Sequence, residues 1–263
     1  MNASPHPVHD DGRERIAIVD PQPVVRSWIS SLLSHSGHWT TTWDCADSAD
    51  ALKNVEAEEP DLLITEIRLR EGLDGLMMVK ALLRNHPDLR ILVYSSHSEE
   101  FYAERCLRAG AMGYLHKHDP SYRLEEAVEA ILHGELSVNE RIRRQAMRNA
   151  SGNVVTEGVE GVLRRLTDRE LEIILLLGRG NSFRESARML GITSSTVQVH
   201  ANGIRRKLGL GGTLELLAFA GKISPLLDDR SAVEGGATVA DDVKGLTHPE
   251  LIASVRRFVE RYP

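Results

Sequence analysis

The stretch Pro60-Asp-Leu-Leu-Ile-Thr-Glu-Ile-Arg-Leu69 decides the fold class of the front half of the chain. Its apolar run from Leu62 to Ile64 is typical of a buried strand in a parallel sheet, and a single acid, Glu66, stands where this run ends. In open α/β sheets, binding and chemistry are placed at the carboxyl ends of the strands. We therefore expect Glu66 to lie at a functional site of an α/β domain.

Strand-like runs alternate with helical patterns on both sides of this stretch. The expected strands are residues 15–20, 39–44, 60–69, 90–95 and 112–115, and the expected helices are 23–33, 48–57, 75–85, 99–109 and 122–133. Five repeats of a strand and a helix predict a doubly wound parallel sheet with helices on both faces.

A compact helical unit is expected farther along the chain, with helices over 166–177, 182–190, 194–208 and 214–220. Capping boxes at Thr167 to Glu170 and at Ser182 to Glu185 mark the starts of the first two helices. Gly191 lies in the short turn between the second and third helices, which is typical of a helix-turn-helix.

The third helix of this unit has two distinct faces. Four apolar residues at helical spacing form one buried stripe: Val197, Ala201, Ile204 and Leu208. The opposite face presents Ser195, Gln198, Val199, Asn202 and Arg206, with Arg205 and Lys207 beside it. Amide, apolar and guanidinium groups suit base edges, thymine methyls and phosphates in a major groove, so this face predicts binding to double-stranded DNA. The alternative is the solvated surface of an ordinary helical bundle.

The distribution of charge agrees with that prediction. Residues 1–160 carry a net charge of −9 and residues 161–222 carry +5, within a chain of 263 residues whose net charge is −6. Only the rear part is therefore suited to a polyanion.

Several classes of protein are not expected from the composition. No apolar run approaches the roughly 20 residues of a membrane span, and the N-terminus lacks the apolar core of a signal peptide. Cys45 and Cys106 fit neither a metal spacing nor a disulfide framework. We expect a cytoplasmic protein that has no membrane partner and no cofactor.

The domain organisation predicted from these patterns has five parts. A disordered arm covers residues 1–14, an α/β domain 15–135, a linker 136–160, the helix-turn-helix domain 161–222, and a tail 223–263. The tail ends in an amphipathic helix over 248–261, which we expect to pack on the chain itself, with partner binding as the alternative.

The two halves together resemble response regulators of the NarL/FixJ family, in which a flavodoxin-like receiver domain precedes a LuxR-type helix-turn-helix domain. The rear half carries this pattern at Leu166, Thr167, Arg169, Glu170, Ala187, Leu190, Gly191, Thr196, Val197, Val199, His200, Lys207, Leu208 and Gly209. The resemblance implies that Gln198, Val199 and Asn202 face bases and that Lys207 lies towards the DNA backbone. It also implies that the helix from Leu214 serves dimerisation, so that a homodimer binds half-sites about one helical turn apart. A sensor kinase or another regulatory protein is the further partner implied.

In the front half, the same resemblance implies a phosphorylation pocket at the carboxyl ends of the strands. Its hydroxyl is Ser95, its lysine is Lys117, its switch aromatic is Tyr114, and Asp20 occupies the first of two acidic positions. Two residues depart from the family pattern, because Pro21 stands at the second acidic position and Glu66 replaces the phosphate-accepting aspartate.

These departures have physical consequences for phosphorylation. Mg²⁺ demands near-octahedral oxygen geometry, and only a weak residual site at Asp20 and Glu66 remains, so no metal is expected. Glutamate also displaces the nucleophile by about 1.5 Å, one C–C bond, and a displacement near 1 Å costs about a hundredfold in rate. We predict that the domain is not a conventional phosphoacceptor.

Three interpretations of Glu66 stay open from the sequence. Its carboxylate reaches Ser95 and Lys117 and mimics phosphoaspartate, with one negative charge against about two. Alternatively, it is a structural acid that pairs with Lys117 in a dimerisation or docking scaffold. In the third interpretation, acetyl phosphate or a kinase still modifies a residue of the domain.

A group of histidines close to this pocket is a further candidate for metal binding. Its members are His97, His116 and His118, with Asp119 beside them. Two histidines two residues apart on a loop fix no coordination geometry, so we expect solvent-facing side chains instead.

The sequence as a whole predicts a DNA-binding transcriptional regulator, an atypical response regulator that works without conventional aspartyl phosphorylation. One alternative is a protein-interaction adaptor whose receiver-like domain docks a partner; another is a regulator still phosphorylated by a kinase. An enzyme is not expected, because no nucleophile and base are paired outside the altered pocket.

Overall fold

The computed structural model describes residues 12–69, 75–140, 142–144, 159–228 and 246–261. The chain divides into two compact units, Met1–Arg143 and Arg144–Pro263. Most of the expected arm, residues 141 and 145–158 of the expected linker, and residues 229–245 and 262–263 of the expected tail lie outside the described residues.

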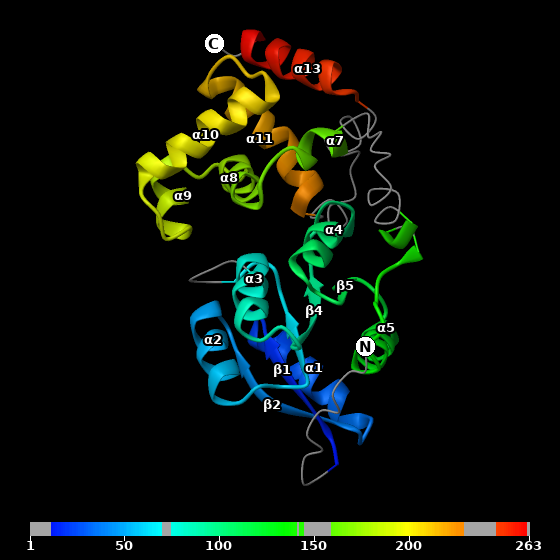
Figure 1. Ribbon diagram of the computed structural model, residues 1–263. Helices are drawn as coiled ribbons and strands as arrows, with labels where there is room; N and C mark the ends of the chain where they lie inside the picture. Colours follow the sequence, from blue (N-terminus) through cyan, green and yellow to red (C-terminus); the bar gives the residue numbers. More distant parts are fainter. Residues whose placement is uncertain (1–11, 70–74, 141, 145–158, 229–245, 262–263) are drawn as a thin grey trace. The chain divides into compact units, whose positions relative to one another are not determined.

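The first unit is an α/β fold built on five parallel strands in the order β2-β1-β3-β4-β5 (Figure 1). The strands are β1 (Glu14–Val19), β2 (Trp39–Cys45), β3 (Leu62–Thr65), β4 (Arg90–Ser95) and β5 (Gly113–His116). The helices are α1 (Pro23–His35), α2 (Ser48–Ala57), α3 (Gly75–Asn85), α4 (Glu99–Ala109) and α5 (Ser121–Leu132). The expected five-stranded, doubly wound sheet is confirmed.

Strand order brings the pocket residues together. β1 and β3 are neighbours, with Val19 opposite Thr65 in register, so Asp20 and Glu66 follow adjacent strand ends. β4 pairs with the other edge of β3, and its last residue is Ser95. The core under this edge is apolar, with Ile18 and Ile64 at most 1% exposed, and it anchors the strands whose ends carry the polar residues.

The chain beyond α5 returns to the open edge of the sheet. Tyr114 donates its backbone N–H to Ser137 O (3.0 Å), and Ser137 donates to Met112 O (2.9 Å). Ile142 is 1% exposed. Residues 137–140 and 142, although expected in the linker, therefore cover the β5 edge of the first unit.

The second unit is helical. Its helices are α7 (Val159–Arg164), α8 (Asp168–Gly178), α9 (Phe183–Met189), α10 (Ser194–Leu208), α11 (Thr213–Asp228) and α13 (His248–Arg261). Both expected capping boxes are present, and Thr193 accepts the backbone N–H of Thr196 at the start of α10. These caps set the starts of the helices that position the candidate DNA-reading face.

The helix α11 is longer than expected, and the C-terminal helix α13 packs on the rest of this unit. The helix expected over 214–220 continues to Asp228 and contains Pro225. Its later residues Ile223 and Leu227 are fully buried, so tertiary packing carries the helix past Gly221. The helix α13 packs against α11 and α7, with Leu251 and Val255 fully buried.

Among the described helices, none is by itself both long and apolar enough to cross a membrane. Only α10 and α11 taken together meet that test, and they are bent by 80° relative to one another.

Candidate functional site

Glu66 lies in a buried polar pocket at the end of β3. Its side chain is 4% exposed. One carboxylate oxygen, Oε1, accepts the Ser95 hydroxyl and the Ile67 backbone N–H (2.6 Å). The other oxygen, Oε2, accepts the backbone N–H of Ser96 (3.3 Å) and faces the Lys117 ammonium at 2.8 Å. Both oxygens of Glu66 therefore have protein partners.

Lys117 bridges the two buried acids of the pocket. Its Nζ donates to Asp20 Oδ2 as well as pairing with Glu66. Its backbone N–H donates to Ser95 O (2.8 Å), which fixes the loop after β5 against the end of β4. Asp20 is 2% exposed, and its Oδ1 accepts the backbone N–H of Gln22 (2.8 Å). The pocket thus contains two carboxylates and one ammonium.

Burial and charge act in opposite directions on these groups. Burial alone raises the pKa of Glu66, but the hydrogen bond with His97 and the charge of Lys117 hold that pKa well below its usual value. For Asp20, burial is the stronger effect, so its pKa is raised despite Lys117. Burial lowers the pKa of Lys117, but the two carboxylates more than offset it and raise the pKa. Glu66 is therefore the firmly ionised acid of the pair.

His97 belongs to this pocket, although the sequence suggested it only as one of several candidate metal ligands. Its Nδ1 lies 3.1 Å from Ser95 Oγ and 3.7 Å from Glu66 Oε1, and its residue is 4% exposed. Its carbonyl accepts the hydroxyl of Tyr114 (2.6 Å), a side chain that is 1% exposed. The sequence signal was its position two residues after Ser95, at a strand end.

The other members of the histidine group do not converge on a common ligand position. His116 and His118 stack on one another with ring centroids 5.0 Å apart, and Asp119 accepts the backbone N–H of His116. Across the described residues, no three His, Cys, Asp or Glu side chains are arranged to hold a metal ion.

The receiver pattern implies Mg²⁺ at Asp20 and Glu66, and the residues here do not fit it. Pro21 offers no side-chain oxygen. The Lys117 ammonium already stands between the two carboxylates, where a bridging cation would have to bind.

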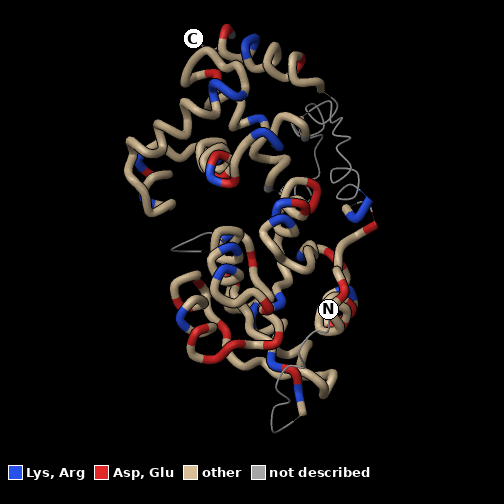
Figure 2. The backbone as a smooth tube through the Cα atoms, in the orientation of Figure 1, with Lys and Arg blue, Asp and Glu red and all other residues tan. Residues whose placement is uncertain are grey.

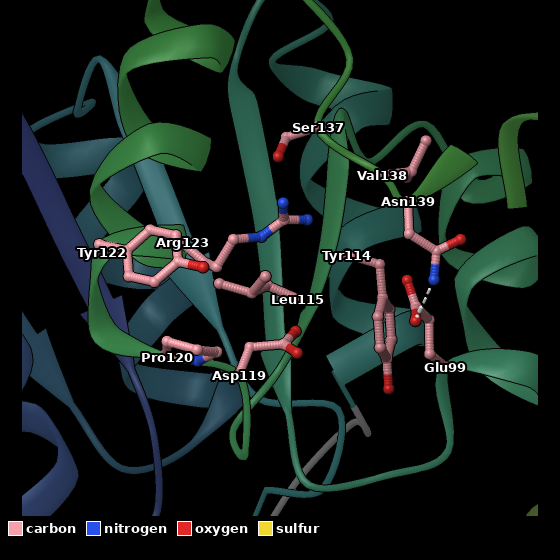
Figure 3. A pocket seen from close by; sticks show the side chains of 10 residues that line it. All are labelled: Glu99, Tyr114, Leu115, Asp119, Pro120, Tyr122, Arg123, Ser137, Val138 and Asn139. Atoms are coloured by element: carbon pink, nitrogen blue, oxygen red, sulfur yellow. Dashed lines mark hydrogen bonds between the residues drawn. The ribbon is translucent and has the colours of Figure 1, made fainter. Parts of the chain in front are cut away.

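A polar cavity of about 260 Å³ lies next to Tyr114 (Figure 3). Tyr114, Glu99 and Asn139 line one side of it, and Tyr122 and Arg123 line the other. Asn139 donates to Glu99 Oε2 (2.5 Å), so the segment after α5 is tied to the start of α4. Through Tyr114, this cavity and the Glu66 pocket share one side chain.

The second site is the outer face of α10. Val197, Ile204 and Leu208 are fully buried, and Ala201 is 3% exposed. The structure places five of the predicted DNA-contacting residues on the exposed side: Ser195, Gln198, Val199, Asn202 and Arg206. Val199 is 69% exposed, so this face presents an apolar side chain beside its polar ones.

The two remaining predicted DNA contacts have partners within the chain. Arg205 donates to Asn202 Oδ1 (3.3 Å) and to Gly211 O (2.8 Å). Lys207 pairs with Glu170 Oε2 at 2.5 Å. The basic last turn of α10 is visible in Figure 2, but only Arg206 of its three cations is exposed.

Glu170 lies close to Gly203, a glycine in the middle of α10, where glycine costs about 1 kcal/mol against alanine. It is 5% exposed, and a Cβ at Gly203 would lie 3.0 Å from its Oε1. Burial raises the pKa of Glu170, but the hydrogen bond from Lys207 and the capping contact with Thr167 hold it below the usual value. Gly203 thus allows α10 to pass close over an ionised carboxylate of α8.

Comparisons with known proteins cover both sites. The response regulator receiver domain matches residues 16–129, and the luxR family of bacterial regulatory proteins matches residues 164–220. The oxygen regulatory protein NreC of Staphylococcus carnosus (strain TM300) is 30% identical over 216 residues, which are 81% of this chain and 99% of that protein. NreC of Staphylococcus aureus (strain bovine RF122 / ET3-1) is 29% identical over 208 residues, 78% of this chain and 96% of that protein.

A solved structure has a similar fold. RcsB from Salmonella enterica serovar Typhimurium, bound to promoter rprA in the presence of phosphomimetic BeF3−, gives a TM-score of 0.59 at 22% identity, covering 80% of this chain and 98% of that chain.

Proposed function

Since the chain belongs to the response regulators that join a receiver domain to a luxR-type DNA-binding domain, we propose that it reads promoter DNA through the outer face of α10 and does so without aspartyl phosphorylation. Members of this family are DNA-binding transcription regulators and not enzymes.

The observation that carries the DNA-reading proposal is the exposure of Gln198, Val199 and Asn202 on a helix whose opposite stripe is buried. The two amides suit adenine edges, and Val199 suits a thymine methyl. Arg206 adds a cation for the phosphate backbone. RcsB is described bound to promoter DNA, which supports the reading of promoter DNA here. The proposal includes a homodimer on paired half-sites, as the family resemblance implies.

The experiment starts from a duplex that the full-length chain selects from a randomised DNA pool. Asn202→Ala is expected to cost about 1–3 kcal/mol and to relax the base preference at one position. Arg206→Ala is expected to weaken binding to all duplexes and to reduce the salt slope by about one. Arg257→Ala is the matched control, because it removes an exposed cation of the same unit outside α10.

Lys207 is a poor choice for this experiment. Replacing it would leave Glu170 buried without its cation, so a loss of binding would report misfolding of α8 and α10. If Asn202→Ala and Arg206→Ala bind the selected duplex as tightly as Arg257→Ala, with the same salt dependence, the DNA-reading proposal fails and the adaptor function becomes the better account.

The proposal that the receiver domain works without phosphorylation rests on the contacts of the Glu66 carboxylate. Its carboxylate reaches the Ser95 hydroxyl and the Lys117 ammonium together, which are the groups that the family pattern assigns to a phosphoryl group. Glu66 therefore acts as a fixed, partial mimic of phosphoaspartate, with one charge in place of about two. The buried Tyr114, bonded to His97 O, is the aromatic that this arrangement holds inward.

Intact mass measurement after incubation with acetyl phosphate and Mg²⁺ tests this part. We expect no phosphoryl adduct on the wild-type chain. The double variant Pro21→Asp with Glu66→Asp restores both missing acids and is expected to gain an adduct. A stoichiometric adduct on the wild type that is lost in Glu66→Gln would contradict the proposal, and a kinase-dependent regulator would replace it.

A further inference from the structure

The C-terminal helix α13 lies outside the matched luxR region, which ends at residue 220. It is nevertheless part of the second unit, where Leu251 and Val255 are fully buried and Ile252 is 7% exposed. Thr247 and Glu250 cap its start, with the Thr247 N–H donating to Glu250 Oε2 (2.8 Å). The helix is thus docked and capped.

Two polar side chains of α13 reach the end of the DNA-reading helix. His248 donates from Nε2 to Leu208 O (3.2 Å), and Arg256 donates to Gly209 O (3.2 Å). Leu208 is the last residue of α10, and Gly209 is its left-handed cap with φ of 70°. The last carbonyls of a helix have no partner within the helix, and they lie at the negative end of its dipole. His248 and Arg256 of α13 therefore supply hydrogen-bond donors to carbonyl groups at the end of α10 that have no donor within that helix.

A chain of polar contacts continues from α13 to Arg205. Arg256 pairs with Glu215 (3.7 Å), and Glu215 accepts the Gly211 N–H (2.9 Å). Gly211 O in turn accepts Arg205 (2.8 Å), which also donates to Asn202 on the exposed face. Arg256 therefore contacts both the cap of α10 and the acid that holds the turn between α10 and α11.

We propose that α13 is a brace for the recognition helix and that Arg256 is its main positioning residue. By holding Gly209 O and Glu215, Arg256 fixes the last turn of α10 and the 209–211 turn, and through Arg205 it sets the position of Asn202. This inference rests on the proposed DNA-reading function of α10. It assigns to the C-terminal extension a role in DNA affinity without direct contact to DNA.

The test compares Arg256→Met with Arg257→Met in the full-length chain. Both variants remove one cation from neighbouring positions of one helix, and Arg257 is exposed. The probe is the duplex that the wild-type chain selects from a randomised pool. Arg256→Met is expected to bind it about two- to fivefold more weakly than Arg257→Met does, since the broken contacts are partly exposed. Arg256→Lys, which keeps the charge and a donor, is expected to recover most of the affinity.

Amide hydrogen exchange gives the readout that a merely structural role would not produce. We expect faster exchange confined to residues 205–211 in Arg256→Met, with an unchanged unfolding midpoint. Equal DNA affinity and equal exchange in the two methionine variants would overturn the brace. Exchange that rises over the whole second unit together with a lower midpoint would overturn it as well.

The experiment distinguishes failure of the hypothesis that Arg256 braces α10 from failure of the hypothesis that α10 reads DNA. If the wild-type chain selects no duplex, DNA reading by α10 fails, and exchange over 205–211 still decides whether Arg256 holds the end of the helix.

Discussion

At the scale of single residues, Lys117 decides whether the front pocket is stable. It is the ammonium that both Asp20 and Glu66 contact, and all three side chains are at most 12% exposed. Removing one partner of a buried ion pair leaves an uncompensated charge, which costs about 3–5 kcal/mol.

The two ends of this network are expected to respond differently to substitution. Lys117→Met leaves two buried carboxylates without their cation and is expected to lower the free energy of unfolding at neutral pH by about 3–5 kcal/mol. Glu66→Gln leaves the Asp20 and Lys117 pair balanced, so a smaller loss is expected. Urea unfolding of both variants measures the difference, and a larger loss in Glu66→Gln would show that Lys117 is not the key charge.

The same network predicts an effect of pH with a definite sign. In the wild type, the lowered pKa of Glu66 stabilises the fold above its usual value of 4.5, and this contribution is lost as the pH falls through the folded-state value. In Lys117→Met, Asp20 loses the cation that opposes burial, so its pKa rises further and that variant gains stability on acidification. We expect its deficit against the wild type to shrink between about pH 7 and pH 5. A deficit that stays constant would contradict this assignment of charges.

Gly75 is a further residue on which the pocket depends. A Cβ there would lie 2.2 Å from Glu66 O and 2.7 Å from Ile67 Cα, which are backbone atoms that no rotamer change can move. Gly75→Ala is therefore expected to destabilise the first unit by about 1–3 kcal/mol, measured by thermal unfolding. Gly221→Ala, where nothing lies within 4 Å of the added Cβ, is the control and should cause no loss. Unchanged unfolding of Gly75→Ala would disprove the close approach.

The residues of the pocket were only partly predictable from sequence. Asp20, Glu66 and Ser95 follow apolar strands, so their convergence at one sheet edge follows from the strand pattern. The inclusion of His97 depends on the direction of a side chain in a loop, which the local sequence does not determine. The pairing of Lys207 with Glu170, 37 residues apart, likewise leaves no local signal.

At the scale of elements, the sequence predicted α3, β4, α4, α10 and α13 with the bounds that the structure shows. Glycine, proline or a capping residue stands beside most of these boundaries, so local chemistry sets them. The length of α11 was not predictable in this way. Gly221 suggested an end, but burial of Ile223 and Leu227 keeps the chain helical to Asp228.

Asn139, in the segment after α5, is expected to stabilise the first unit. Asn139 accepts the Ile142 N–H (2.8 Å) and donates to Glu99, which anchors the segment beside Tyr114. Asn139→Ala is expected to cost about 1 kcal/mol in the unfolding of the first unit, because it removes a cap. Asn139→Ser keeps a capping oxygen and should retain most of that stability. Equal losses in the two variants would show that the bond to Glu99, and not the cap, holds the segment.

In the molecule as a whole, negative charge is concentrated in the front part of the chain and positive charge in the helix-turn-helix part. Residues 1–160 carry −9 and residues 161–222 carry +5, so the rear unit is the part suited to DNA. The front unit contains a pocket in which the Lys117 ammonium contacts both Asp20 and Glu66, and the proposed independence from phosphorylation rests on these contacts.

DNA reading without phosphorylation is tested by measuring the affinity of the full-length chain for its selected duplex, before and after incubation with acetyl phosphate and Mg²⁺. The account predicts tight binding by the untreated chain, with a dissociation constant that the treatment leaves unchanged. Binding that appears or strengthens tenfold or more, about 1.4 kcal/mol, only in the treated sample and together with a phosphoryl adduct would contradict it.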